Sequence, residues 1–215
     1  MPKGESSRAS RSDTSHHALV RPAGALAAIE PLWLHIGGEE VKAGWKILNI
    51  QAKPGVDFVG SATDLSDFAD GSAERIYASH IYEHLNYGDE VTVAFAHAHR
   101  VLAPGGQLFV AVPNLEVLCQ AMIHPETTTE GQFHLQRMIY GGHIDAYDYH
   151  HAGFTPGLLA SYLHGVGFHH VAQVESFGLF MDTSELRVGP FPISLNVIAT
   201  KAPPAGKPGA TGSAR

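Results

Sequence analysis

The sequence predicts a single α/β domain built on a doubly wound, mostly parallel sheet of seven strands that ends in a C-terminal antiparallel hairpin. Strand-like and helix-like segments alternate along the 215-residue chain, which is the pattern of a sheet wound with helices on both faces. The last two strand-like segments have no helix between them, so we expect them to pair as an antiparallel hairpin at one edge. Only the nine residues 37–45 separate the first two strands. A parallel crossover normally needs about a dozen or more residues, so the first crossover helix should be short or missing.

Short apolar runs between glycine, proline and polar residues predict the strands. Their ranges are 33–36, 46–50, 57–60, 74–79, 107–112, 171–177 and 193–200. The run 107–112 (QLFVAV) is almost continuously apolar and is followed by Pro113. This pattern is typical of a strand buried on both faces, so we place it near the middle of the sheet.

Periodic apolar residues predict the helices. The clearest helix covers 89–102, where apolar side chains recur every three or four residues. These side chains are Val91, Ala94, Phe95, Ala98, Val101 and Leu102. Asp89 lies where an N-cap is expected, and Pro104-Gly105-Gly106 ends the helix. A second helix is predicted over 130–140, and a third begins at Thr155-Pro156, where Thr caps and Pro fits the first turn.

The composition fits one globular domain between two polar ends. Hydrophobic residues make up 44% of the chain, which is enough to fill a core. We expect residues 1–22 and 203–215 to be disordered tails, because they are polar and lack any apolar period. The folded domain is therefore expected over 23–202.

Charge and cysteine content exclude several classes of protein. The formal net charge of −7 argues against general affinity for nucleic acid or an anionic membrane. No apolar run approaches the roughly 18 residues that a membrane-spanning helix needs. Cys119 is the sole cysteine, so an intrachain disulfide and a cysteine-rich zinc site are excluded. We see no secretory signal peptide and expect a cytoplasmic protein.

Four segments carry motifs at the predicted strand ends: LHIGG (34–38), ATDLSDF (62–68), IYASHIYEHL (76–85) and HRVLAPGGQLFVAVPNLE (99–116). They resemble, in this order, the glycine-rich turn, the adenine-side segment, the fourth strand with its Glu-His-Leu helix start, and the stretch into strand five of class I S-adenosylmethionine (SAM) dependent methyltransferases. The last motif is the most specific. The resemblance covers residues 32–201 and implies a Rossmann-like sheet. It looks closest to a bacterial subgroup of predicted methyltransferases with a segment like GGHIDAYDYHHAGF.

The resemblance implies that SAM is the cofactor and that it binds at the carboxyl ends of the strands. Gly37 and Gly38 remove side chains there, so a ligand can approach the backbone; the alternative is an ordinary tight turn. Asn49 and Gln51, at the end of the second strand, can bond the ribose hydroxyls.

The adenine and methionine parts of SAM are assigned to two further segments. The Asp64 carboxylate can accept from the adenine amine, with the apolar Leu65 beside it. Asp64 can also cap a helix over 65–68. Ser79 and His80 follow the fourth strand and should border the methionine portion.

Two departures from the family pattern weaken the expected SAM site. The family usually has Asp or Glu at the end of strand two, whereas Asn49 and Gln51 are neutral amides, which bond a hydroxyl without charge assistance. The glycine loop is short and carries Glu39 and Glu40, which do not favour a carboxylate ligand. We therefore expect weak SAM binding, or a pocket completed by other elements.

The long segment 115–155 should cover the acceptor side. Its histidines include His143 and His150, which together with His84 are our candidate general bases for O-methylation, with Tyr149 as an orienting group. The alternative is that these side chains only pack and bond within the lid.

A divalent metal is a further alternative for the same segment, with four candidate ligands. They are His143, Asp145, Asp148 and His150. The family's metal-dependent O-methyltransferases place their ligands in a different pattern, so we expect no metal site.

Three functions remain open at this point. The first is SAM-dependent methyl transfer to a small-molecule or glycan acceptor, with oxygen favoured over nitrogen. The second is a catalytically inactive binding or scaffold protein that keeps the fold, which the short first crossover would suit. The third is a different small-ligand enzyme on the same fold, since fold alone does not fix function.

Overall fold

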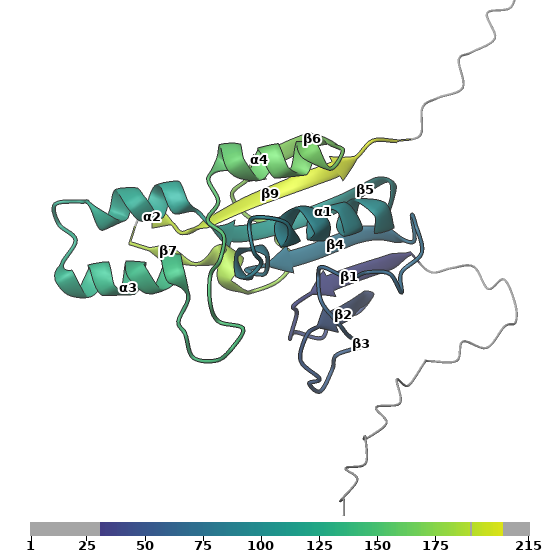
Figure 1. Ribbon diagram of the computed structural model, residues 1–215, viewed down its shortest axis with the longest axis horizontal. Coiled ribbons are helices and arrows are strands. Elements are labelled where there is room, and N and C mark those ends of the chain that lie inside the picture. Colours follow the sequence, from purple (N-terminus) through teal and green to yellow (C-terminus); the bar gives the residue numbers. More distant parts are fainter. Residues whose placement is uncertain (1–30, 190, 204–215) are drawn as a thin grey trace, which may run out of the picture.

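The computed structural model describes residues 31–189 and 191–203, and its centre is a seven-stranded sheet in the order β3-β2-β1-β4-β5-β9-β6 (Figure 1). The strands are β1 (Leu32–Ile36), β2 (Trp45–Asn49), β3 (Phe58–Val59), β4 (Ala73–Ser79), β5 (Leu102–Pro113), β6 (Phe168–Val174) and β9 (Ser194–Lys201). Seven strands wound outward in both directions from β1 and β4 confirm the predicted doubly wound sheet. A separate two-stranded ribbon pairs β7 (Arg187–Val188) with β8 (Phe191–Pro192).

Strand direction also agrees with the sequence. The strands β1 to β5 pair in parallel, whereas β9 lies antiparallel between β5 and β6. The predicted terminal hairpin is therefore confirmed as the β6–β9 pair. Because β1, β2 and β4 run in the same direction, their last residues Ile36, Asn49 and Ser79 lie along one edge of the sheet. That edge is where a ligand site is expected in an open α/β sheet.

The helices of the described residues are α1 (Glu90–Val101), α2 (Leu115–Met122), α3 (Thr129–Tyr140) and α4 (Pro156–Gly165), with single 3₁₀ turns at Tyr82–His84 and Thr183–Glu185. Two of these four helices, α1 and α4, begin at the capping residues that the sequence predicts. Asp89 accepts from the backbone N–H of Glu90, and Thr155 accepts from that of Leu158. Asn114 caps α2, a helix that was not predicted from the sequence. The helix considered for 65–68 is a turn in the structure.

The two faces of the sheet are covered differently. The apolar faces of α1 and α4 contribute Val91, Phe95, Leu159 and Leu163 to the main core on one face. On the opposite face the described residues form a mainly aromatic cluster, which includes the loop around Phe180 and has no helix over it. The prediction of helices on both faces is thus met on one face in the described part of the chain. In Figure 1, α2 and α3 lie beyond the carboxyl ends of β1 and β4.

The first crossover contains no helix. Residues 37–44 form turns and bends, and the backbone N–H of Gly37 donates to the carbonyl of Leu48, 2.7 Å away. The prediction of a short or missing first crossover helix is confirmed. The carboxyl edge of β1 is consequently left open on this side, without a helix N-terminus beside it.

The predicted tails fall outside the described residues, wholly for 1–22 and almost wholly for 203–215, as does the predicted start of the domain at residue 23. Within the described part, each helix is too short or too polar to cross a bilayer.

Candidate functional site

A cavity of about 400 Å³ opens at the carboxyl edge of β1, β2 and β4, where the sheet geometry places a ligand. Its walls come from the ends of these strands, the loop after β3, the turn after β4 and the segment that follows α3. The lining residues include Gly37, Asn49, Gln51, Ser61, Ala62, His80, Ile81, His84, Asp145, Tyr147, Asp148 and Tyr149. The last four form a flap over the strand ends.

Of the two glycines predicted to contact the cofactor, the structure places Gly37 in the cavity wall. Its φ of 75° is in the left-handed region, and a Cβ there would lie 1.9 Å from Cδ1 of Ile81. The missing side chain therefore leaves room for Ile81, which also lines the cavity. Gly38 packs instead against the ring of His35, 2.5 Å from where its Cβ would be, and is not among the lining residues.

The amides at the end of β2 both line the cavity, as predicted. Asn49 is buried, and its side chain is already engaged on both sides. Its Nδ2 donates to the carbonyl of Gly38 at 3.2 Å, and its Oδ1 accepts from the backbone N–H of Gln51 at 2.9 Å. Asn49 therefore fixes the loop after β1 to the end of β2. Because the chain has no helix there, this side chain replaces part of the missing support.

Near the segment where adenine contacts are predicted, Ser61 and Ala62 line the cavity, whereas Asp64 and Leu65 are not among the lining residues. Asp64 is exposed and accepts from the backbone N–H of Ser66 at 3.0 Å; bonds from Ser66 lower the pKa of this carboxyl. Leu65 is fully buried in the main core. The structure thus places both predicted residues just outside the lining, in a turn that shapes it.

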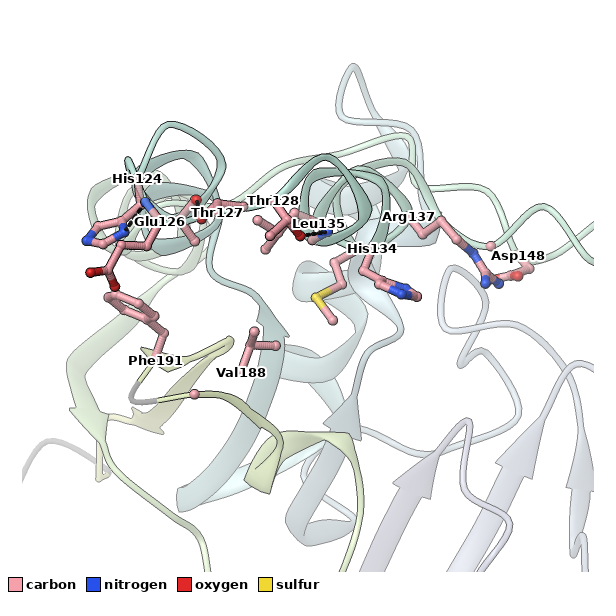
Figure 2. Close-up of a pocket in the computed structure, with 15 residues that line it drawn as sticks. His124, Glu126, Thr127, Thr128, His134, Leu135, Arg137, Asp148, Val188 and Phe191 are labelled. Carbon is pink, nitrogen blue, oxygen red and sulfur yellow. Dashed lines mark hydrogen bonds between the residues drawn. The ribbon is translucent and has the colours of Figure 1, made fainter.

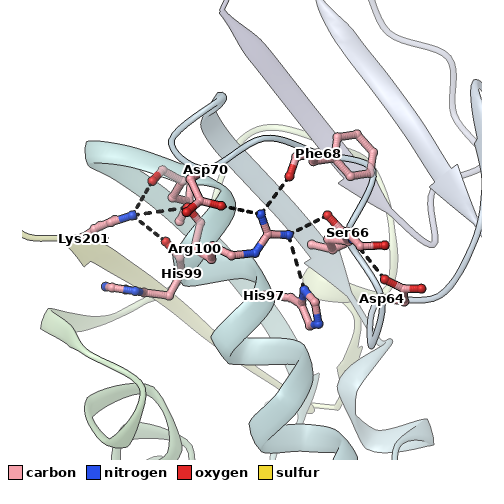
Figure 3. Close-up of polar contacts among 10 residues, drawn as sticks. Asp64, Ser66, Phe68, Asp70, His97, His99, Arg100 and Lys201 are labelled. Atoms are coloured by element: carbon pink, nitrogen blue, oxygen red, sulfur yellow. Dashed lines mark hydrogen bonds and ion pairs between the residues drawn. The ribbon is translucent and has the colours of Figure 1, made fainter. Parts of the chain in front are cut away.

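Arg100 of α1 holds this turn in place (Figure 3). Its guanidinium donates to the carbonyls of Leu65 at 2.7 Å and Phe68 at 2.8 Å, and pairs with Asp70 at 2.7 Å. The planar fork of arginine suits several acceptors at once. The loop that carries Ser61 and Ala62 is therefore fixed by a helix that does not reach the cavity.

The turn after β4 brings His80 into the cavity wall, as predicted, while Ser79 lies just outside it. His80 has a φ of 54°, a left-handed conformation that is uncommon for a non-glycine residue and tends to occur at functional sites. Its Nε2 lies 2.8 Å from Oγ of Ser194, and Ser194 donates its own proton to the carbonyl of Thr183. The His80 Nε2 must therefore be the donor to Ser194. Its Nδ1 lies 3.0 Å from Oε1 of Glu83.

Glu83 lies beside the cavity, in the 3₁₀ turn and directly before the lining residue His84, and was not among the site residues predicted from the sequence. It is completely buried. Burial alone raises the pKa of its carboxyl, but the charges of His80, His84 and His150 outweigh that effect, and the pKa is lowered overall. The available signal was the spacing His80-x-x-Glu83-His84, which puts a carboxylate and imidazoles on one side of a tight turn.

The structure brings two of the three candidate bases together, His84 and His150, and leaves His143 apart from them. His84 lines the cavity, and its Nδ1 lies 3.1 Å from the carbonyl oxygen of Tyr149. His150 lies behind it, with ring centroids 4.8 Å apart, and burial lowers the pKa of His150. His143 is exposed, stacks on Tyr149 with centroids 4.0 Å apart, and is not among the lining residues.

A larger cavity of about 950 Å³ lies next to the first, between α2, α3 and the β7–β8 ribbon (Figure 2). Phe191 and Val188 face the two helices across it, and Figure 2 shows Arg137 and Asp148 at one end. Asp148 lines both cavities, so the flap is the partition between them.

Comparison with known proteins agrees with this geometry. The family model described as a methyltransferase domain matches residues 38–110, from the loop after β1 into β5. The match covers about a third of the chain, so this segment is similar to a methyltransferase domain. No curated protein matches the sequence.

The fold of this chain is shared with solved structures of low sequence identity. A SAM-dependent methyltransferase from Archaeoglobus fulgidus is 16% identical with a TM-score of 0.50, over 80% of this chain and 86% of that one. The methyltransferase (CMeT) domain of the citrinin polyketide synthase is 14% identical with a TM-score of 0.50, over 81% of this chain and 47% of that one. This chain thus spans about half of the synthase structure and most of the archaeal one. At these identities the likeness establishes the fold.

Proposed function

We propose that this chain transfers the methyl group of SAM to an oxygen of a small-molecule or glycan acceptor. The observation that carries the proposal is the cavity at the carboxyl ends of β1, β2 and β4, with Gly37 and Asn49 in its wall. This edge of a doubly wound sheet is where such folds bind nucleotide-like ligands. A cytoplasmic location stays a prediction.

The cavity supports one orientation of the cofactor. Asn49 and Gln51 stand at the end of β2, where the ribose hydroxyls would lie, and Ser61 with Ala62 borders the adenine side. His80 and Ile81 border the methionine side. Because the Asn49 amide is already bonded to the Gly38 carbonyl, Gln51 is the side chain with freedom to reach a hydroxyl.

The acceptor is proposed to enter from the larger cavity. Its volume of about 950 Å³ falls in the range of small-molecule sites, and the flap residue Asp148 borders both cavities. The formal net charge of −7 gives no support for a nucleic acid acceptor.

The chemistry is a displacement at the methyl carbon. A lone pair of the acceptor oxygen forms the new C–O bond, the C–S bond of SAM breaks, and its electron pair returns to sulfur, which leaves S-adenosylhomocysteine. The acceptor hydroxyl loses its proton in the process. Of the predicted bases, His84 is the one that lies in the cavity wall. It can accept the proton, because its Nδ1 donates to the Tyr149 carbonyl and its Nε2 therefore keeps a lone pair.

Titration with S-adenosylhomocysteine tests the proposal, by calorimetry and by thermal unfolding. A ligand that binds only the folded chain stabilises it by about 2.7 kcal/mol at a hundredfold excess over its dissociation constant. We expect saturable binding in the wild-type chain. Ser61→Phe should abolish it, because this side chain lies in the wall of the cavity.

Ser66→Phe is the matched control. Ser66 is exposed on the same loop and is not in the wall, so binding should survive. The absence of binding at millimolar ligand would overturn the proposal and favour an inactive scaffold that keeps the fold. Equal binding by both variants would place the ligand elsewhere.

A further inference from the structure

Three side chains that could bind a cation converge beside the cofactor cavity. The ligand atoms of Glu83, His84 and His150 all lie within 4.8 Å of one another. Glu83 and His84 come from the 3₁₀ turn after β4, and His150 comes from the segment after α3. We propose that this cluster binds a divalent transition-metal ion, which the sequence reading did not expect.

The buried carboxylate of Glu83 is the first reason. The residue is 0% exposed, and its Oε1 lies 3.0 Å from Nδ1 of His80. Its Oε2 has no hydrogen-bond partner among the described residues. A buried carboxylate oxygen without a donor is strongly unfavourable, so such groups are normally paired or bound to a metal. The unpartnered oxygen belongs to the same cluster as the two imidazoles.

The tautomers of the two histidines are the second reason. The Nδ1 of His84 faces the carbonyl of Tyr149, which can only accept, so this nitrogen carries the proton and Nε2 keeps its lone pair. The ring of His150 likewise bonds the backbone carbonyl of Ile139. A histidine that ligates a metal typically donates its other ring N–H to a carbonyl or carboxylate. Both rings are therefore held with one free nitrogen available.

The backbone fixes the two halves of the cluster together. The carbonyl of Glu83 accepts from the backbone N–H groups of His151 at 2.7 Å and Ala152 at 3.0 Å. The segment after α3 is thus attached to the turn after β4 at the point where the ligands meet. A site held on rigid backbone in this way needs no large movement to bind an ion.

The donor set indicates the class of ion. Two imidazoles and one carboxylate suit Zn²⁺, Mn²⁺, Co²⁺ or Fe²⁺, whereas Mg²⁺ and Ca²⁺ prefer oxygen ligands alone. Three protein ligands leave a coordination position of the ion open. Because His84 is one of the ligands and also lines the cavity, the open position would lie at the cavity wall. If the proposed function holds, an acceptor hydroxyl bound there would lose its proton more readily, and the metal would replace His84 as the activating group.

Direct metal binding tests the inference without any assay of activity. The untagged chain, freed of metal with a chelator, is titrated with Zn²⁺ by calorimetry and with Co²⁺ by visible absorption. We expect one equivalent to bind, with the absorption bands of imidazole ligation. His84→Ala and Glu83→Gln should each weaken this binding more than about tenfold.

His143→Ala is the matched control, because His143 lies in the same segment but outside the cluster. It should bind as the wild-type chain does. Because Glu83 is buried and its variant can fail to fold, His84→Ala, checked by circular dichroism, is the deciding variant. Equal binding by the wild-type chain and His84→Ala would overturn the proposal.

A titration with S-adenosylhomocysteine in chelator separates this inference from the proposed function. Nucleoside binding without metal binding would overturn the metal site alone. Metal binding at the cluster without nucleoside binding would overturn the proposed function and leave the metal site standing.

Discussion

The amide of Asn49 stands at the end of β2, where the methyltransferases that this sequence resembles usually carry a carboxylate, and its hydrogen bonds account for the difference. Its Nδ2 donates to the Gly38 carbonyl, 3.2 Å away. A carboxylate has no proton to donate there and would put negative charge against that oxygen. The neutral residue is therefore matched to a first crossover that has no helix, because the loop after β1 depends on this donor.

Asn49→Asp should lower the free energy of unfolding by about 1–3 kcal/mol, the usual effect of leaving a buried acceptor without its partner. Gln51→Glu introduces the same charge two residues later, where no side-chain bond is lost, and should change stability by less than about 0.5 kcal/mol. Urea unfolding of both variants measures the difference. Equal stability of the two would contradict the role given to the Asn49 amide.

At the residue scale the sequence pointed to five of the residues that line the cavity and missed the others. Gly37, Asn49, Gln51, His80 and His84 line the cavity as expected. The other predicted residues are Gly38, Asp64, Leu65, Ser79, His143 and His150, which lie behind or beside it. Which residue of a loop faces a cavity depends on turn geometry, and a turn that shifts by two or three residues exchanges Asp64 for Ser61. Sequence spacing does not determine that shift.

At the scale of elements, α1 supports the site without touching it. Three acceptors of the β3–β4 loop bond to Arg100 (Figure 3), which is not among the residues that line the cavity. A single ammonium group cannot reach the Leu65 and Phe68 carbonyls in the same geometry. The position of the loop that carries Ser61 and Ala62 therefore depends on the planar guanidinium of Arg100.

Arg100→Lys should loosen this loop although it keeps the charge. We expect a loss of stability of about 1–3 kcal/mol, the range for hydrogen bonds to charged groups. The affinity for S-adenosylhomocysteine should fall several-fold, with faster hydrogen exchange over 61–70. Arg75→Lys is the control, since Arg75 lies over the Trp33 ring and touches no part of this loop. If nucleoside affinity falls equally in both variants, Arg100 does not position the loop specifically.

Elements with strong local signals were predicted well. The 3.6-residue period and Asp89 cap located α1, and the absence of a helix before the last strand located the β6–β9 hairpin. The helix α2 was not predicted, because its eight residues make little more than two helical turns and directly follow a buried strand. The 3.6-residue apolar repeat is too short there to be recognised. The absence of helices from one face of the sheet, in the described residues, could not be predicted. The alternation of strand and helix patterns along the sequence does not say on which face each helix packs.

At the scale of the whole molecule, different side chains and elements pack against the two faces of the sheet. One face carries a mixed core of aliphatic and aromatic side chains under α1 and α4. The other carries an aromatic cluster of Trp45, Tyr77, Phe109 and Phe180, without a helix over it in the described part of the chain. His35 lies within this cluster, 5% exposed, with its ring centroid 4.2 Å from that of Phe180.

This arrangement makes the stability of the domain depend on pH. Burial lowers the pKa of His35 from 6.5 to about 4, against a smaller opposing effect of Asp182. Between these values the unfolded chain binds a proton that the folded ring does not, so stability rises with pH across this window and falls on acidification. Each tenfold change in proton affinity corresponds to about 1.4 kcal/mol. Protonation of this ring therefore lowers the free energy of unfolding by about 3 kcal/mol between neutral pH and pH 4.

His35→Phe should remove that contribution, because a phenyl ring of similar shape can fill the cluster without taking up a proton. Stability of the wild-type chain should therefore fall by about 3 kcal/mol more than that of the variant between pH 7 and pH 4. Urea unfolding across this range measures the difference, with His143→Ala, an exposed histidine, expected to follow the wild-type curve. His99 and His150, whose pKa values burial also lowers, contribute equally to all three chains and cancel in the comparison. Parallel curves for the wild-type chain and His35→Phe would show that the aromatic face tolerates a charged imidazole, and that the acid sensitivity of the fold arises elsewhere.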